Sequence, residues 1–129
     1  MPIQPRARVL CVDSDEDSRE MLSTLLKSYR LETETVATAA QALSLIQAER
    51  FDLYLLEAWL PGLDGFELCR RMRDVDPHTP ILFFSGAASE AEKKRGIEAG
   101  ATVYVSKPDV DGLLGRISEL VPLADYAVA

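Results

Sequence analysis

Short apolar runs alternate with stretches in which apolar residues recur at helical spacing, and this pair repeats five times along the chain. The runs that we predict to be β-strands are residues 8–12, 32–36, 52–56, 81–84 and 102–105. Three of them are almost continuously apolar, which is typical of strands covered on both faces. The pattern therefore predicts strict alternation of strand and helix.

The stretches between the strands place apolar residues on one helix face. Thr38 with Gln41 and Ser89 with Glu92 have the spacing of a capping box, which marks a helix start. The helix expected from about Ser89 to Ala99 differs from the others because its many charges leave it little apolar surface, so we expect most of it to be solvated. We also expect a solvated side on the helix after Gly65, formed by Arg70, Arg71 and Arg73.

Alternating strands and helices with short connections predict an α/β fold in which parallel strands are joined by right-handed crossovers and helices cover both faces of the sheet. The pattern begins at Arg8 and ends at Val121. We therefore predict one domain over residues 8–121, preceded by an N-terminal extension of residues 1–7 and followed by a C-terminal tail of residues 122–129.

Composition and charge narrow the class of protein. The chain has 129 residues, of which 47% are hydrophobic, and a net charge of −7. This charge disfavours direct binding to nucleic acid, because a phosphate backbone repels it. Cys11 and Cys69 lack metal-site or disulfide spacing and are expected to be buried thiols in a reducing compartment. No apolar stretch has the length of a membrane span, so we expect a cytoplasmic protein without membrane association.

Polar residues follow four of the predicted strands. The carboxyl ends of parallel strands meet at one edge of the sheet, where open α/β folds place their chemistry. Carboxylates, a hydroxyl and an ammonium at such an edge suit metal-assisted phosphoryl transfer, in which acids hold a cation and one carboxylate attacks phosphorus. The residues concerned are Asp13, Ser14 and Asp15, then Glu57, then Ser85, and finally Ser106, Lys107 and Pro108.

Over residues 8–121 the sequence resembles the receiver domains of two-component response regulators. The resemblance rests on VLCVDSDEDSREML, FDLYLLEAWLPGLDG, PILFFSG and YVSKP. It implies a flavodoxin-like (βα)5 three-layer sandwich with a five-stranded parallel sheet, and a role in bacterial phosphorelay signalling. It also implies that Ser85 and Lys107 contact the phosphoryl group, that the Lys107-Pro108 peptide is cis, and that Tyr104 is the aromatic whose rotamer reports the active state.

Two positions depart from the pattern of that family. The phosphoacceptor is normally Asp, and here it is Glu57. The first turn normally carries two adjacent acids, and here Ser14 replaces the one that binds Mg²⁺ directly, which leaves Asp13 and Glu57 as metal ligands unless Asp15 compensates. We therefore expect Mg²⁺ binding to be weak or absent and no cofactor to be required. Trp59, two residues after Glu57, brings an indole beside the expected pocket.

The extra methylene of Glu57 has a predictable effect. It moves the carboxylate outward by about 1.5 Å, and in-line attack tolerates little misplacement, so phosphorylation should be slow or absent. The longer side chain could instead reach Lys107 and Ser85 and mimic part of a phosphorylated Asp. The alternative is a relic that pairs with Lys107 and contributes only stability. The residues alone leave both interpretations open.

The function expected from these features is a pseudo-receiver: a receiver-like signalling module that acts by protein contact and is not an enzyme. One alternative is a conventional response regulator that still accepts phosphate. Another is a haloacid-dehalogenase-type phosphatase, suggested by Asp13-Ser14-Asp15, but the second acidic pair and the cap domain of that class are missing. A flavin binder is disfavoured because the acidic DEDS segment would repel phosphate.

The expected partners are proteins. In the family, the fourth helix, fifth strand and fifth helix form the usual contact face, and the resemblance carries this face to the present chain. We expect it to bind a histidine kinase, a downstream effector or a second copy of the chain. In this chain the face would include Lys93, Lys94, Arg95, Tyr104, Asp109 and Arg116.

Overall fold

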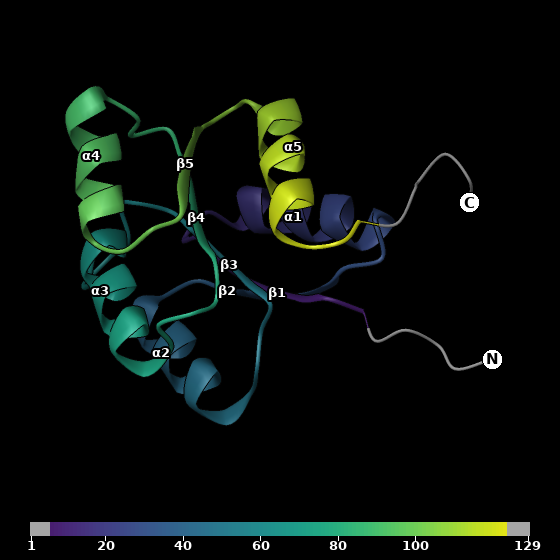
Figure 1. Cartoon of the computed structure of the whole chain (residues 1–129), viewed down its shortest axis with the longest axis horizontal. Helices are drawn as coiled ribbons and strands as arrows, with labels where there is room; N and C mark the ends of the chain where they lie inside the picture. Colours follow the sequence, from purple (N-terminus) through teal and green to yellow (C-terminus); the bar gives the residue numbers. More distant parts are fainter. Residues whose placement is uncertain (1–5, 124–129) are drawn as a thin grey trace.

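The structure, a computed structural model, describes residues 6–123 and has strands and helices in strict alternation along them (Figure 1). The strands are β1 (Arg8–Val12), β2 (Glu32–Val36), β3 (Leu53–Leu56), β4 (Ile81–Ser85) and β5 (Val103–Ser106). The helices are α1 (Glu16–Ser28), α2 (Ala39–Ala48), α3 (Gly65–Val75), α4 (Glu90–Glu98) and α5 (Val110–Leu120). Residues 1–5 of the predicted extension and 124–129 of the predicted tail lie outside the described residues.

All strand pairs are parallel and the order in the sheet is β2-β1-β3-β4-β5. The interior strands β3 and β4 are buried along their whole length, as their apolar sequences predict. The edge strand β2 reads ETETV and is partly exposed throughout. The predicted α/β fold with a five-stranded parallel sheet is therefore confirmed.

Two apolar cores lie on opposite faces of the sheet because successive side chains of a strand point to opposite sides. Val9 and Cys11 of β1 face the core that is shared with α1 and α5. Leu10 and Val12 face the core that is shared with α2 and α3. Figure 1 shows α1 and α5 on one side of the sheet and α2, α3 and α4 on the other. The result is the predicted three-layer sandwich.

The helices begin at side chains that accept a hydrogen bond from a backbone N–H three residues ahead. Both predicted capping boxes, at Thr38 and Ser89, are confirmed. Asp15, Asp64 and Asp109 cap α1, α3 and α5 in the same manner. No helix in residues 6–123 combines the length and apolar character needed to cross a membrane.

Both cysteines are buried free thiols, as predicted. Burial raises the pKa of Cys11 to about 12 and that of Cys69 to about 11, because the thiolate loses its solvation inside the core. Neither thiol is a ready nucleophile at neutral pH.

Some local predictions are wrong. β3 begins one residue later than predicted because the Asp52 side chain turns to accept a hydrogen bond from the Arg8 backbone N–H. The strand β4 extends one residue further and ends at Ser85, and β5 both begins and ends one residue later than predicted, at Val103 and Ser106. Arg73 is not on a solvated side: its guanidinium donates to the carbonyls of Asp76, Thr79 and Gly100, which ties the end of α3 to two loops.

Candidate functional site

The carboxyl edge of the sheet brings together the chemistry-bearing residues that the sequence singled out. Val12 and Leu56 are register partners in adjacent strands, so Asp13 and Glu57, which follow them, are neighbours. Ser85 ends β4, and Lys107 follows β5. Four strand ends thus supply two carboxylates, one hydroxyl and one ammonium to a single cluster.

Glu57 is held on both carboxylate oxygens. Its Oε1 accepts a short hydrogen bond from the Ser85 hydroxyl and a 3.0 Å bond from the backbone N–H of Ala58. Its Oε2 lies 2.9 Å from Nζ of Lys107, and only 13% of the side chain is exposed. The longer side chain therefore reaches both Ser85 and Lys107, as its length predicts.

Lys107 lies between the two carboxylates. Its Nζ is 2.7 Å from Oδ2 of Asp13, 2.9 Å from Oε2 of Glu57 and 3.3 Å from the hydroxyl of Ser18. Burial by itself would lower the pKa of Lys107, but the hydrogen bonds and charges of Asp13 and Glu57 outweigh it and raise that pKa above its ordinary value. The peptide bond between Lys107 and Pro108 is cis, as predicted.

In the turn that follows β1, Asp13 and Asp15 each accept a hydrogen bond from a nearby backbone N–H. Asp13 is buried, and its Oδ1 accepts a 2.9 Å hydrogen bond from the backbone N–H of Asp15. The Asp15 side chain caps α1 by accepting from the backbone N–H of Ser18, and the hydrogen bonds with Ser18 lower its pKa. Ser14 is exposed. Asp15 is thus engaged as the cap of α1.

Several carboxylate oxygens of this cluster are already engaged by other groups of the protein. Mg²⁺ requires a near-octahedral set of oxygen ligands. Here the Lys107 ammonium lies within 3 Å of one oxygen of each carboxylate, and other oxygens of Asp13 and Glu57 accept hydrogen bonds. Within residues 6–123, the structure places no three His, Cys, Asp or Glu residues where they could hold a metal ion.

Tyr104 connects this cluster to β5 and to the loop after β4. Its hydroxyl donates to the carbonyl of Ala87, whose N–H in turn donates to the Ser85 hydroxyl at 3.1 Å. Its ring stacks on Phe83 with centroids 5.1 Å apart. Burial raises the pKa of Tyr104, so the phenol stays protonated and remains a donor at neutral pH.

Trp59 is half exposed, and its contacts are with α3 and α4. Its ring meets the edge of Phe66 at 5.6 Å, and its Nε1 lies 3.4 Å from Oε2 of Glu92. Arg95 lies against the same two rings. Sequence reasoning did not single out Phe66, because an aromatic residue at helical spacing is most often a simple core residue.

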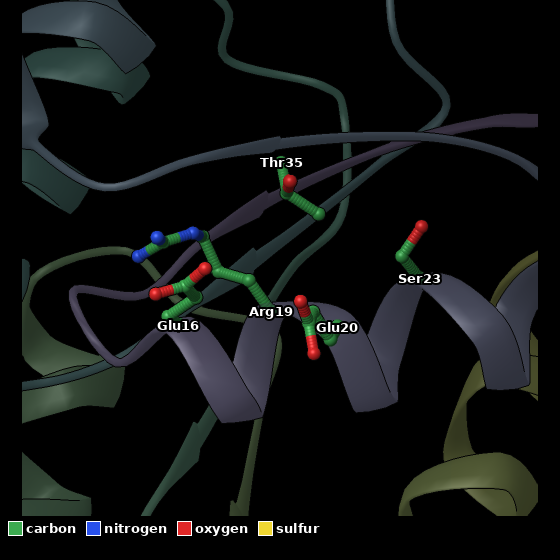
Figure 2. Close-up of a pocket in the computed structure, with 5 residues that line it drawn as sticks. All are labelled: Glu16, Arg19, Glu20, Ser23 and Thr35. Atoms are coloured by element: carbon green, nitrogen blue, oxygen red, sulfur yellow. The ribbon is translucent and has the colours of Figure 1, made fainter.

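A separate hollow of about 300 Å³ lies between α1 and β2. Figure 2 shows four side chains from successive turns of α1 and one from β2 around it. Its lining mixes two carboxylates, one guanidinium and two hydroxyls: Glu16, Glu20, Arg19, Ser23 and Thr35. None of the predicted site residues lines it.

Comparison with known proteins decides the family. The model of the response regulator receiver domain matches residues 9–118. This chain is a receiver domain of the response regulator family. Receiver domains are the signalling modules of two-component systems, and the predicted resemblance is confirmed.

The relatives and neighbours agree with this assignment. The chain is 36% identical over 103 residues to the DNA-binding response regulator MtrA of Mycolicibacterium smegmatis, covering 80% of this chain and 45% of that protein. It is 36% identical over 115 residues to the response regulator MprA of Mycolicibacterium vanbaalenii, covering 88% of this chain and 50% of that protein. The chain thus spans about half the length of these curated relatives.

Solved receiver structures have the same fold. The chemotaxis protein CheY4 of Vibrio cholerae superposes with a TM-score of 0.85 at 32% identity, covering 91% of this chain and 100% of that one. A putative response regulator from Chloroflexus aurantiacus gives a TM-score of 0.85 at 31% identity, covering 90% of this chain and 98% of that one. The predicted flavodoxin-like class is therefore confirmed.

Proposed function

We propose that this receiver domain acts by protein contact in a phosphorelay, with phosphorylation at the acceptor position weak or lost. The engagement of Glu57 carries the proposal. A carboxylate nucleophile must present an oxygen in line with the incoming phosphorus. Both oxygens of Glu57 are already bonded, to Ser85 and the Ala58 N–H on one side and to Lys107 on the other.

The first turn supports the same proposal. Ser14 supplies a neutral hydroxyl where the family has a metal-binding acid, and Asp15 is engaged as the cap of α1. Without an offsetting cation, a phosphate donor approaching Asp13 and Glu57 meets like charge. In this proposal Mg²⁺ binds weakly at Asp13 and Glu57, and the signalling role requires no cofactor and no enzymatic turnover.

In this proposal Glu57 is a standing substitute for a phosphorylated acceptor. The family resemblance assigns the phosphoryl contacts to Ser85 and Lys107, and the Glu57 carboxylate bonds both of them. Tyr104 bonds the Ala87 carbonyl next to this cluster. The substitute would hold these residues in one arrangement without a phosphorylation step.

Intact-mass spectrometry after incubation with acetyl phosphate tests the proposal. We expect no phosphorylation of the unmodified protein, of Glu57→Asp or of Ser14→Asp, because each single variant repairs only one of two defects. The double variant should become phosphorylated, and only when Mg²⁺ is present. Adding Trp59→Asn to the double variant tests whether the indole also hinders the donor. Phosphorylation of the unmodified protein at Glu57 would overturn the proposal in favour of a conventional acceptor.

The proposed partners are a histidine kinase, a downstream effector or a second copy of the chain, bound through α4, β5 and α5. Lys94 and Arg116 are exposed cations on this face of a chain with a net charge of −7, which suits an acidic partner surface. Lys94→Glu should weaken self-association or capture of the kinase. Lys27→Glu, an exposed charge reversal on α1, is the matched control. Equal binding by both variants would remove α4 from the interface.

A further inference from the structure

The helix α4 is weakly anchored by apolar contacts. Among its residues, all of which the structure describes, only Gly96 is buried, and Ile97 is 49% exposed. A helix normally gains most of its stability from burying an apolar face against its neighbours. Other contacts must therefore hold α4 in place.

Arg95 supplies those contacts at the middle of the helix. Its guanidinium lies 4.3 Å from the ring centroid of Phe66 in α3 and 5.7 Å from that of Trp59. Its Nη2 is also 3.6 Å from Oδ2 of Asp64, the residue that caps α3. A guanidinium within about 6 Å of an aromatic face is attracted by the ring quadrupole, and the planar group can stack on the ring.

Trp59 supplies the matching contacts from the loop after Glu57. Its Nε1 lies 3.4 Å from Oε2 of Glu92, one turn before Arg95 on α4. The loop itself is closed by a 2.7 Å hydrogen bond from the Gly65 N–H to the Ala58 carbonyl, so Trp59 is displayed from a fixed turn. The indole is nevertheless 50% exposed, and a binding partner can reach it.

The same rings continue toward β5. Phe66 packs on Phe83 with centroids 5.4 Å apart, and Phe83 stacks on Tyr104 at 5.1 Å. Gly96, next to Arg95, faces the Tyr104 ring, which an added Cβ would approach to 2.7 Å. One row of aromatic rings thus runs from the loop after Glu57 to β5, and α4 lies against both ends of it.

We propose that Trp59 and Arg95 form a latch that holds α4 against the loop following Glu57 and sets the position of the helix relative to Tyr104. When the latch opens, α4 moves or frays while the sheet stays folded, because the helix has few other buried contacts. A partner that covers Trp59 would open this latch and thereby change the position of α4 and of its lysines. The latch does not depend on whether Glu57 accepts phosphate.

Amide hydrogen exchange of the full chain tests the latch. Arg95→Met keeps an apolar stem but removes the cation, and Glu98→Met is the matched control at an exposed position of the same helix that is not assigned to the partner face. In Arg95→Met, the amides of residues 93–99 should exchange about 5- to 30-fold faster, which corresponds to about 1–2 kcal/mol of cation–π and stacking energy at 1.4 kcal/mol per tenfold change. The amides of β1 and β3 should accelerate much less.

Trp59→Leu should accelerate the same amides. The double variant with Arg95→Met should accelerate them by less than the product of the two single effects, because the contact between Arg95 and the Trp59 ring is lost in either single variant. Equal α4 exchange in Arg95→Met and Glu98→Met would overturn the latch. Equal acceleration of α4 and of the central strands would also overturn it, because it would mean a loss of global stability only. These exchange measurements need neither phosphorylation nor a partner, so the latch can be refuted independently of the proposed function.

Discussion

Removing the ion pairs of Lys107 is the sharpest test of how much the charged cluster at the carboxyl edge of the sheet contributes to the free energy of unfolding. Lys107→Met keeps the stem of the side chain and removes the only ammonium that Asp13 and Glu57 contact at 2.7 and 2.9 Å in the described structure. The Asp13 side chain is 5% exposed and that of Glu57 13%, so water cannot readily replace the lost partner. Two neighbouring carboxylates are left without a counter-charge.

The magnitude follows from this burial. Breaking a buried ion pair by removing one partner costs about 3–5 kcal/mol. Because 22% of the Lys107 side chain is exposed, we expect the lower end, about 3 kcal/mol. A small domain is stable by about 5–15 kcal/mol, so the variant should still fold. Adding Glu57→Gln should recover part of the loss, since it removes one of the two stranded charges.

Urea unfolding followed by circular dichroism measures this loss, provided that the m-value is unchanged between variants. The matched control is Arg116→Met, which breaks the exposed pair of Arg116 with Glu119 at 3.1 Å, where the side chains are 52% and 60% exposed. Exposed pairs contribute at most about 1 kcal/mol. If both variants lose the same free energy of unfolding, the reasoning from burial is refuted.

Three further predictions concern the same edge of the sheet. Because the pKa of Lys107 is raised in the folded state, its stabilising contribution is present below its ordinary pKa of 10.5 and is lost as the pH rises through the folded pKa. At alkaline pH, the free energy of unfolding should therefore fall more steeply with pH for the unmodified protein than for Lys107→Met. Parallel curves of this free energy against pH would contradict the prediction. Gly96→Ala should lower the free energy of unfolding by about 1–3 kcal/mol, because the added Cβ would lie 2.7 Å from the Tyr104 ring. In Gly115→Ala the added Cβ, in α5, would enter open space, so this variant should instead raise the free energy of unfolding by about 0.5–1 kcal/mol. Urea unfolding measures both changes. Glu57→Ala should shift the NMR signals of Tyr104 if Glu57 is a standing substitute, whereas a relic would shift only those of its direct partners Ser85 and Lys107 and change the stability.

Much of the fold could be predicted from the chain itself because its signals are local. Continuous apolar runs predict interior parallel strands, and spacing of the type Ser89 to Glu92 predicts a helix start; both depend on residues close in sequence. The gathering of Asp13, Glu57, Ser85 and Lys107 was also predictable, since parallel strand ends must meet at one edge of a sheet.

Only the tertiary structure decided which partner each side chain takes. Whether Glu57 reaches Ser85 and Lys107 was left open by the sequence, and the folded chain places both within contact of its carboxylate. Arg73 was expected in solvent, but its guanidinium is held by the loops that precede β4 and β5. The latch of Trp59 and Arg95 joins residues more than thirty positions apart, and no local pattern marks it. Periodicity reports which face of an element is apolar, whereas the pairing of polar and aromatic groups depends on distances between elements that only the folded chain establishes.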